Sequence, residues 1–439
     1  MSFLKSHILN YIFIFTFILV AFTVDVKAQE HNADIQQKDV TYIIKTLAAD
    51  SMMGRRTFTP GIQKAAHFIV KKFEEIGLEK KQGLDSYRQR FEMIKSIPEE
   101  IDVRVDGQTI SSKQAMALST QKNISWTEAS NIKIDTIGAE DSFIAMLRNY
   151  MEAEQNTLVW VDKTLSAPFK RIKSFFEEQT SFPDSVSVVF ILSDPASNFE
   201  IAIKNKQAVK KTANIVGVLP GDTFPNEFVV FSAHYDHLGV ADEPVNGDRI
   251  YNGANDDASG TTAVIELAKY FKARNDNKRT IIFVTFTGEE LGGYGSRYFS
   301  QQLDPDKVIA MFNIEMIGTR SKWGKNSAYI TGFDKSSFGK ILQQNLKESE
   351  FTFHPDPYPK QNLFYRSDNA TLARLGVPAH TISTAKMQNE PNYHKLTDEV
   401  STLDLENMKQ IIHAIAESSQ SIISGEDTPT RVEPQSLRQ

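Results

Sequence analysis

The distribution of hydrophobic and polar residues changes twice along the chain. From about residue 35 to 95, apolar positions recur at helical spacing, and Gly77 is suited to end the second of two helices. From about 100 to 205, short β-like stretches alternate with polar loops, and one amphipathic segment lies near residues 169–178. From about 212 onward, near-continuous apolar stretches alternate with amphipathic ones, and a helix is predicted over residues 258–274.

The third region predicts the fold class. Continuous apolar stretches interleaved with amphipathic helices are typical of a sheet covered on both faces. We therefore expect an α/β protein with a mixed, mostly parallel central sheet flanked by helices, and with an inserted smaller β-rich domain. The predicted strands are residues 214–219, 227–233, 280–286, 308–314 and 377–383.

The same pattern predicts the domain organisation. The main α/β domain is expected over residues 29–95 and 206–424, with a last helix near 403–423. Residues 96–205 are expected to form the inserted accessory domain. The polar segment 425–439 is predicted to be a disordered tail, because it has few apolar residues to bury.

The first 28 residues are interpreted as an export signal. Lys5 supplies a positive start, residues 8–24 form an apolar core, and V-K-A before Gln29 is suited to cleavage. The alternative is an uncleaved membrane anchor, which the short apolar stretch and the cleavage-like ending disfavour. The expected location is therefore periplasmic or extracellular.

Composition excludes several kinds of site. The 439 residues are 41% hydrophobic and 24% charged, which is ordinary for a globular protein. The net charge is −6 and becomes −7 without the first 28 residues, which hold two lysines and one aspartate. This acidic balance argues against nucleic acid as a partner. The absence of cysteine excludes disulfides, thiolate zinc sites and cysteine nucleophiles.

Histidines and carboxylates that could bind a metal or catalyse a reaction follow the ends of the predicted strands. Ligands of open α/β sheets bind beyond the carboxyl ends of the strands. Paired carboxylates repel one another unless a cation or a shared proton is present, and a carboxylate inside the apolar run 308–318 needs a partner. Imidazole together with carboxylate suits zinc, so we predict a divalent metal site. The residues at these ends are His234, Asp236, Asp256, Asp257, Glu289, Glu290, Glu315 and, in the last loop, His394.

Simpler roles remain open for single residues. An aspartate before a helix commonly caps it, which explains one of Asp256 and Asp257 better than both. A histidine in a loop is usually a surface residue, so the assignment of His394 depends on its neighbours.

Five motifs in this order resemble the zinc aminopeptidases of metallopeptidase family 28. They are A-H-Y-D-H-L-G at 233–239, N-G-A-N-D-D-A-S-G at 252–260, T-G-E-E-L-G-G-Y-G-S at 287–296, N-I-E-M-I-G at 313–318 and Y-H-K-L-T-D-E at 393–399. The resemblance covers about residues 210 to 420, and S-M-M-G-R-R-T-F-T-P-G-I-Q-K-A-A extends it weakly toward residue 40. Residues 96–205 loosely resemble the protease-associated domain of exported bacterial relatives.

The resemblance implies two zinc ions per chain. One would be held by His234, by Asp256 as a bridge and by Glu315. The other would be held by Asp256, Glu290 and His394. Most relatives have aspartate where this chain has Glu315, and many read S-D-H where this chain reads S-D-N at 367–369.

The resemblance also implies the reaction. Glu289 corresponds to the general base that activates a zinc-bound water for attack on a peptide carbonyl. Asp236 corresponds to the carboxylate that orients His234, and Tyr393 to a residue that stabilises the oxyanion. The expected function is an exported dizinc aminopeptidase, with peptides as substrates and no stable membrane association after signal removal.

Three alternatives use the same region. A glutaminyl cyclase would have a related fold and one zinc, but a tryptophan would be expected where Tyr393 stands. A carboxypeptidase of the same family would need a cation for the substrate carboxylate, for which Arg366 is a candidate. A receptor-like protein would keep the fold without metals, which the retention of every ligand type disfavours.

Overall fold

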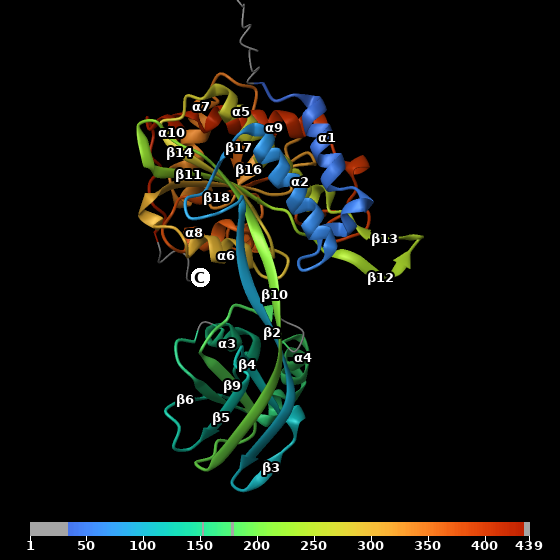
Figure 1. Ribbon diagram of the computed structural model, residues 1–439, viewed down its shortest axis with the longest axis vertical. Coiled ribbons are helices and arrows are strands. Elements are labelled where there is room, and N and C mark those ends of the chain that lie inside the picture. Colours follow the sequence, from blue (N-terminus) through green and yellow to red (C-terminus); the bar gives the residue numbers. More distant parts are fainter. Residues whose placement is uncertain (1–33, 152, 177–179, 434–439) are drawn as a thin grey trace, which may run out of the picture. The chain divides into compact units, whose positions relative to one another are not determined.

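The computed structural model describes residues 34–151, 153–176 and 180–433 (Figure 1). Its largest element is a twelve-stranded mixed sheet. Along the main path of this sheet the strands are β17 (Thr352–Pro355), β16 (Ser327–Ile330), β18 (Ala379–Ser383), β15 (Val308–Ile314), β11 (Phe224–His234), β14 (Arg279–Phe286), β10 (Phe199–Leu219), β2 (Arg88–Val105) and β3 (Gln108–Ile110). The short strands β1 (Glu79–Lys80), β5 (Asn123–Thr127) and β8 (Thr180–Ser181) pair with β10 or β2.

The centre of the sheet is parallel. Strands β18, β15, β11 and β14 run parallel to one another. Strand β16 pairs antiparallel with β18 at one edge of this group, and β10 pairs antiparallel with β14 at the other. The five predicted strands correspond to β11, β14, β15, β18 and the second half of β10. The predicted fold class is confirmed. Strands β16 and β17 are too short to show a clear period and were not predicted.

Helices cover both faces of the sheet because strand residues alternate between them. Phe231 points to one face, where it packs in a cluster with helices α1 (Gln37–Leu47), α2 (Pro60–Ile76), α5 (Ser259–Arg274) and α9 (Leu405–Ser418). Val230 points to the other face, toward α6 (Tyr294–Ser300) and α8 (Asn369–Ala373). Helix α7 (Phe338–Asn345) joins the first cluster.

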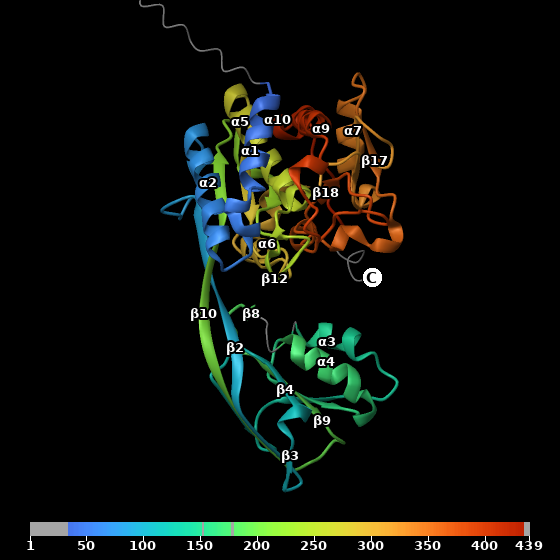
Figure 2. The same ribbon diagram turned by 90° about the vertical axis from the view of Figure 1, so that its right-hand side faces the viewer.

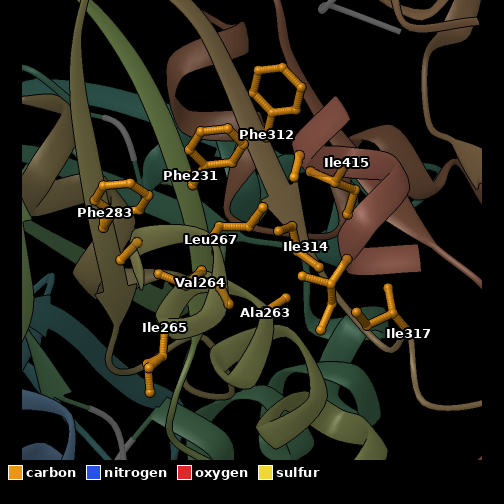
Figure 3. Packing of buried hydrophobic residues seen from close by; sticks show 14 of the residues in the cluster. Phe231, Ala263, Val264, Ile265, Leu267, Phe283, Phe312, Ile314, Ile317 and Ile415 are labelled. Atoms are coloured by element: carbon orange, nitrogen blue, oxygen red, sulfur yellow. The ribbon is translucent and has the colours of Figure 1, made fainter. Parts of the chain in front are cut away.

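Helix α5 lies at the middle of the larger core (Figure 3). Its residues Val264 and Leu267 belong to the same buried cluster as Phe231, Phe283 and Phe312 of three neighbouring strands. The Phe231 ring stacks on the rings of Phe283 and Phe312 at 5.8 and 4.7 Å between centroids. This packing holds α5 and the central strands in one rigid unit, so their ends are well placed to carry a site.

Strands β2 and β10 are unusually long and pair along their length (Figure 2). They cross the predicted boundaries near residues 96 and 205, with one irregularity at Lys204 and Asn205. The chain between β2 and β10 forms a second sheet. Its strands are in the order β4 (Ala115–Ser119), β9 (Ser187–Leu192), β7 (Thr157–Val161) and β6 (Lys133–Ile137), and it includes helices α3 (Phe143–Tyr150) and α4 (Ser166–Phe176). The accessory domain over 96–205 stays a prediction as a separate unit.

The predicted disordered tail is wrong for residues 425–433. After α10 (Gln420–Ser424), the Arg279 guanidinium donates to the carbonyl of Asp427 at 2.7 Å and to the hydroxyl of Thr428 at 2.7 Å. Val432 is 1% exposed. Composition does not predict these contacts. Buried donors elsewhere in the chain bind the polar groups of this segment, and they order it although it has few apolar residues. Residues 434–439 lie outside the described part.

The predicted export signal, residues 1–28, also lies outside the described residues. Among the helices that the structure describes, none combines the length and the apolar character needed to cross a membrane.

Arg55 connects the segments that carry the predicted site residues. Its side chain is fully buried and donates hydrogen bonds to four backbone carbonyls. The acceptors are Leu47 at 2.8 Å, Tyr235 at 3.0 Å, Asn252 at 2.6 Å and Gly253 at 2.9 Å. Helix α1, the loop after β11 and the loop before α5 are therefore joined by one cation.

We expect Glu266→Gln to change how stability depends on pH. Glu266 lies on α5, is 2% exposed, and burial raises its pKa to about 7 from 4.5. Between these values the folded chain keeps a proton that the unfolded chain has released, so stability falls as pH rises. The variant should therefore gain roughly 1–3 kcal/mol in the free energy of unfolding near pH 8 and almost nothing near pH 4.

Urea denaturation at both pH values measures this difference. Glu74→Gln, on the exposed face of α2, is the matched control and should leave the pH dependence unchanged. An equal gain in the free energy of unfolding for Glu266→Gln at both pH values would contradict the raised pKa of Glu266.

We expect Arg55→Met to destabilise the fold strongly. It removes four hydrogen bonds and leaves buried carbonyls without donors, each costing roughly 1–3 kcal/mol. Arg55→Lys keeps the charge but not the planar fork, so its loss should be smaller. Thermal unfolding compares both with Arg56→Met, whose exposed neighbouring side chain should matter by less than about 0.5 kcal/mol. An Arg55→Met protein as stable as Arg56→Met would refute the role of Arg55 in joining these segments.

Candidate metal centre

The sheet brings the predicted site residues to one edge. Parallel strands end on the same side, and the polar residues that follow them therefore meet there. His234 ends β11, Glu289 and Glu290 follow β14, Glu315 follows β15, His394 lies in the loop after β18, and Asp256 lies in the turn that leads into α5.

Asp256 lies between two groups of candidate ligands. Its Oδ1 is 3.2 Å from Nε2 of His234, and its Oδ2 is 3.3 Å from Nε2 of His394. The same His394 nitrogen is 3.2 Å from Oε2 of Glu290. Ligands at zinc bond lengths in a tetrahedron are about 3.3 Å apart, so both groups have the spacing of ligands to a common ion.

Unpartnered buried atoms support the same interpretation. Within the described part of the chain, His234 Nε2 and Glu315 Oε2 have no hydrogen-bond partner, although both are buried. Buried polar atoms are normally satisfied, so each of these needs a partner of another kind. Glu315, Asp256, Glu289 and His394 line one cavity. The residues around Asp256 therefore suit a divalent metal such as zinc.

Asp257 has a different role from Asp256, to which it is joined by a cis peptide bond. Its carboxylate accepts hydrogen bonds from the backbone N–H of Gly260 at 3.0 Å, Met316 at 3.0 Å and His234 at 3.3 Å. Asp257 thus caps the start of α5 and ties it to the ends of β11 and β15. Capping thus explains one aspartate of the pair, and metal binding by the other, Asp256, stays a prediction.

Asp236 lies in the site, and its predicted role of orienting His234 through the carboxylate stays a prediction. Nδ1 of His234 is 3.2 Å from the backbone carbonyl oxygen of Asp236 and 3.8 Å from its carboxylate. The carboxylate instead accepts from the backbone N–H of Glu289 at 3.2 Å and from the Thr57 hydroxyl at 3.0 Å. The carbonyl is therefore the closer acceptor for His234, and the carboxylate holds the loop of Glu289.

Tyr393 lines the same cavity as the candidate ligands. Its ring stacks on the His394 ring with 3.9 Å between centroids and 21° between planes. Burial raises the pKa of Tyr393, which keeps the phenol protonated and able to donate. Asn369 lies elsewhere: it donates to the carbonyls of Phe364 and Ala379, both at 3.1 Å, and so anchors the S-D-N loop beside β18.

The charges at the site depend strongly on one another. Burial raises the pKa of Glu289 well above its ordinary value and that of Glu315 to about 7. Burial also raises the pKa of Asp256, but the nearby imidazoles of His234 and His394 outweigh it and hold this pKa below its usual range. Hydrogen bonds to Asp256 and Glu290 raise the pKa of His394 to about 10. The site thus attracts positive charge.

Three residues of the site were not assigned from the sequence. Arg55 ends a short 3-10 helix, Asp50–Arg55, and an arginine at such a position usually points to solvent. His237 follows His234 by three residues, and its Nδ1 lies 2.7 Å from Oε1 of Glu290. Asp398 accepts from the backbone N–H groups of Asn255 and Asp256 at 2.8 and 3.0 Å. His237 and Asp398 stand inside the recognised motifs, which was the available signal.

Comparisons with known sequences relate part of the chain to a peptidase family. Residues 214–419 match the model of peptidase family M28. Aminopeptidase YwaD of Bacillus subtilis is 24% identical over 245 residues, which are 54% of this chain and 50% of that protein. A probable zinc metalloprotease of Pyricularia oryzae is 41% identical over 91 residues, which are 21% of this chain and 18% of that protein. The match thus spans half or less of these curated relatives.

Solved structures share the fold. The zinc aminopeptidase BSAP of Bacillus subtilis superposes with a TM-score of 0.55 at 17% identity, over 89% of this chain and 96% of that one. The aminopeptidase of Aneurinibacillus sp. strain AM-1 gives 0.54 at 16% identity, over 90% and 95%. The strand-end motifs and the sequence match both fall within residues 214–419, and this part of the chain is a peptidase family M28 domain.

Proposed function

We propose that this chain is a zinc-dependent aminopeptidase that uses two zinc ions. The observation that carries the proposal is the position of Asp256, which presents one oxygen to His234 and the other to His394. A carboxylate so placed suits a bridge between two ions. Relatives named as aminopeptidases and zinc metalloproteases support the reaction class.

The ligand sets follow from the grouping of the side chains. His234, Asp256 and Glu315 would hold one ion, and Asp256, Glu290 and His394 the other. Zinc, when bound, polarises a peptide carbonyl and lowers the pKa of a water molecule. Glu315 is one methylene longer than aspartate and follows the last residue of β15.

Glu289 and Tyr393 line the cavity and would act on the substrate. The Glu289 carboxylate takes a proton from the attacking water and transfers it to the departing amine. Its position is fixed through its backbone N–H, which donates to Asp236. The Tyr393 phenol donates a hydrogen bond to the oxygen that becomes negative when the carbonyl is attacked.

The direction of cleavage is part of the proposal. The carboxylates that line the cavity suit a free amino terminus, and the aminopeptidase relatives favour this end. Arg366 also lines the cavity and is exposed, so it offers a carboxypeptidase a cation for the substrate carboxylate. We also propose export, which the signal-like residues 1–28 support.

A substrate panel tests the function. Peptides with a free amino end, with an acetylated amino end and with an amidated carboxyl end are compared, with and without a chelator and after zinc is returned. An aminopeptidase loses activity on acetylated peptides and with chelator, and regains it with zinc. Cleavage blocked by amidation but not by acetylation would indicate a carboxypeptidase, and loss of ammonia from amino-terminal glutamine would indicate a cyclase.

Glu289→Gln should lower turnover by about a hundredfold to ten-thousandfold, because the amide cannot accept the proton of the attacking water. Zinc content should stay at the wild-type value, since Glu289 is not among the proposed ligands. Turnover and elemental analysis measure the two effects, with the exposed Glu350→Gln as control. Activity near that of the control would remove Glu289 from its role.

Glu315→Ala should lose one zinc preferentially. It removes a ligand from the ion that His234 shares, whereas the group of Glu290 and His394 keeps all its members. Zinc per chain, measured after dialysis against a weak chelator, should fall from two toward one. Glu350→Ala should retain two, and a Glu315→Ala protein that also retains two would show that Glu315 is not a ligand.

A further inference from the structure

His237 lies directly behind one of the proposed zinc ligands. Its side chain is completely buried, and its Nδ1 is 2.7 Å from Oε1 of Glu290 and 3.9 Å from Oδ2 of Asp256. These three residues offer atoms within 4.8 Å of one another, so His237 is close enough to consider as a ligand.

The distances favour a hydrogen bond over metal ligation. A separation of 2.7 Å is typical of a charge-assisted hydrogen bond and is shorter than the roughly 3.3 Å between two ligands of one zinc. Glu290 also uses its other oxygen, Oε2, toward His394 at 3.2 Å. Each oxygen of Glu290 therefore has its own neighbour, and the one near His237 accepts from an N–H group.

The surrounding backbone holds the His237 ring in this position. Its own N–H donates to the carbonyl of Arg55 at 3.3 Å. Gly253 adopts a φ of +55°, and a Cβ there would stand 2.5 Å from Cδ2 of His237. The His394 ring lies 5.9 Å away between centroids. The ring is thus enclosed by the segments that lead to Asp256 and by His394.

We infer that His237 is a positioning residue, whose Nδ1–H holds Glu290 so that Oε2 faces the zinc it shares with His394. The inference rests on the proposed zinc site. Such partners fix the orientation of a ligand, and their loss commonly weakens metal binding about tenfold to hundredfold. The Nε2 of His237 is buried without a hydrogen-bond partner among the described residues, in keeping with Nδ1 as the protonated nitrogen.

Substitutions that keep or remove the Nδ1 donor test the inference. The amide nitrogen of asparagine lies as far from Cβ as Nδ1 does, whereas that of glutamine reaches farther. His237→Asn should therefore keep the zinc affinity within about threefold, and His237→Gln and His237→Ala should lose about tenfold to hundredfold at one of two sites. Competition with a chromophoric chelator on the full chain measures this affinity without peptide substrate.

The outcomes separate the inference from the proposed function. His67→Gln, on the exposed side of α2, is the control. Wild-type affinity in His237→Ala, or equal loss in His237→Asn and His237→Ala, would overturn the inference while leaving the zinc site in place. A wild-type chain that binds no zinc would overturn the proposed function and this inference together.

If a variant does not fold, a measurement on the unmodified protein tests the same inference. Nitrogen–proton correlation spectra of the zinc-loaded chain report which ring nitrogen of His237 carries the proton. We expect protonation at Nδ1 and none at Nε2. The opposite tautomer would overturn the inference.

Discussion

Repulsion among buried carboxylates is the constraint on which the rest of this structure depends. Two like charges 4 Å apart cost roughly 4 kcal/mol at the effective dielectric of a protein site. Six acidic side chains lie at or near the strand ends, each close enough to at least one other to interact electrostatically, and most are buried. They are Asp236, Asp256, Asp257, Glu289, Glu290 and Glu315. Such a cluster persists only if fixed dipoles, protons or cations compensate it.

Arg55 is a permanent cation close to this cluster. It acts on the cluster through its charge and through its hydrogen bonds to the backbone. Burial lowers its pKa, but the nearby charges of Asp398 and Asp256 oppose this shift and favour the charged form. Its hydrogen bonds go to four carbonyls, so it fixes the backbone rather than neutralising any one carboxylate. It therefore supplies charge at a distance while it sets where Asp256 and His234 stand.

How much the sequence predicts depends on whether a residue acts through its own segment or through distant ones. The apolar stretches that predict β11, β14 and β15 can be seen within each strand's own sequence. The residues that follow these strands meet because parallel strands end on the same side of the sheet. His234, Asp256, Glu290 and His394 were singled out in this way, and their roles as ligands stay predictions. Arg55 and His237 escaped because their roles rest on contacts with carbonyls and carboxylates far along the chain. The packing of residues 425–433 was missed for the same reason, since Arg279 supplies the donors.

The backbone sorts the carboxylates into two classes. Those of Asp236, Asp257 and Asp398 accept N–H groups of the loops, and these bonds shape the site. For Asp256, Glu290 and Glu315, no backbone N–H donates to the carboxylate in the part of the chain described. Histidine nitrogens are the neighbours of Asp256 and Glu290 instead, and among the described residues Oε2 of Glu315 has no hydrogen-bond partner. Since no backbone dipole compensates this second class, its charge is the one that a divalent ion would balance. The first class holds the loops that carry these side chains.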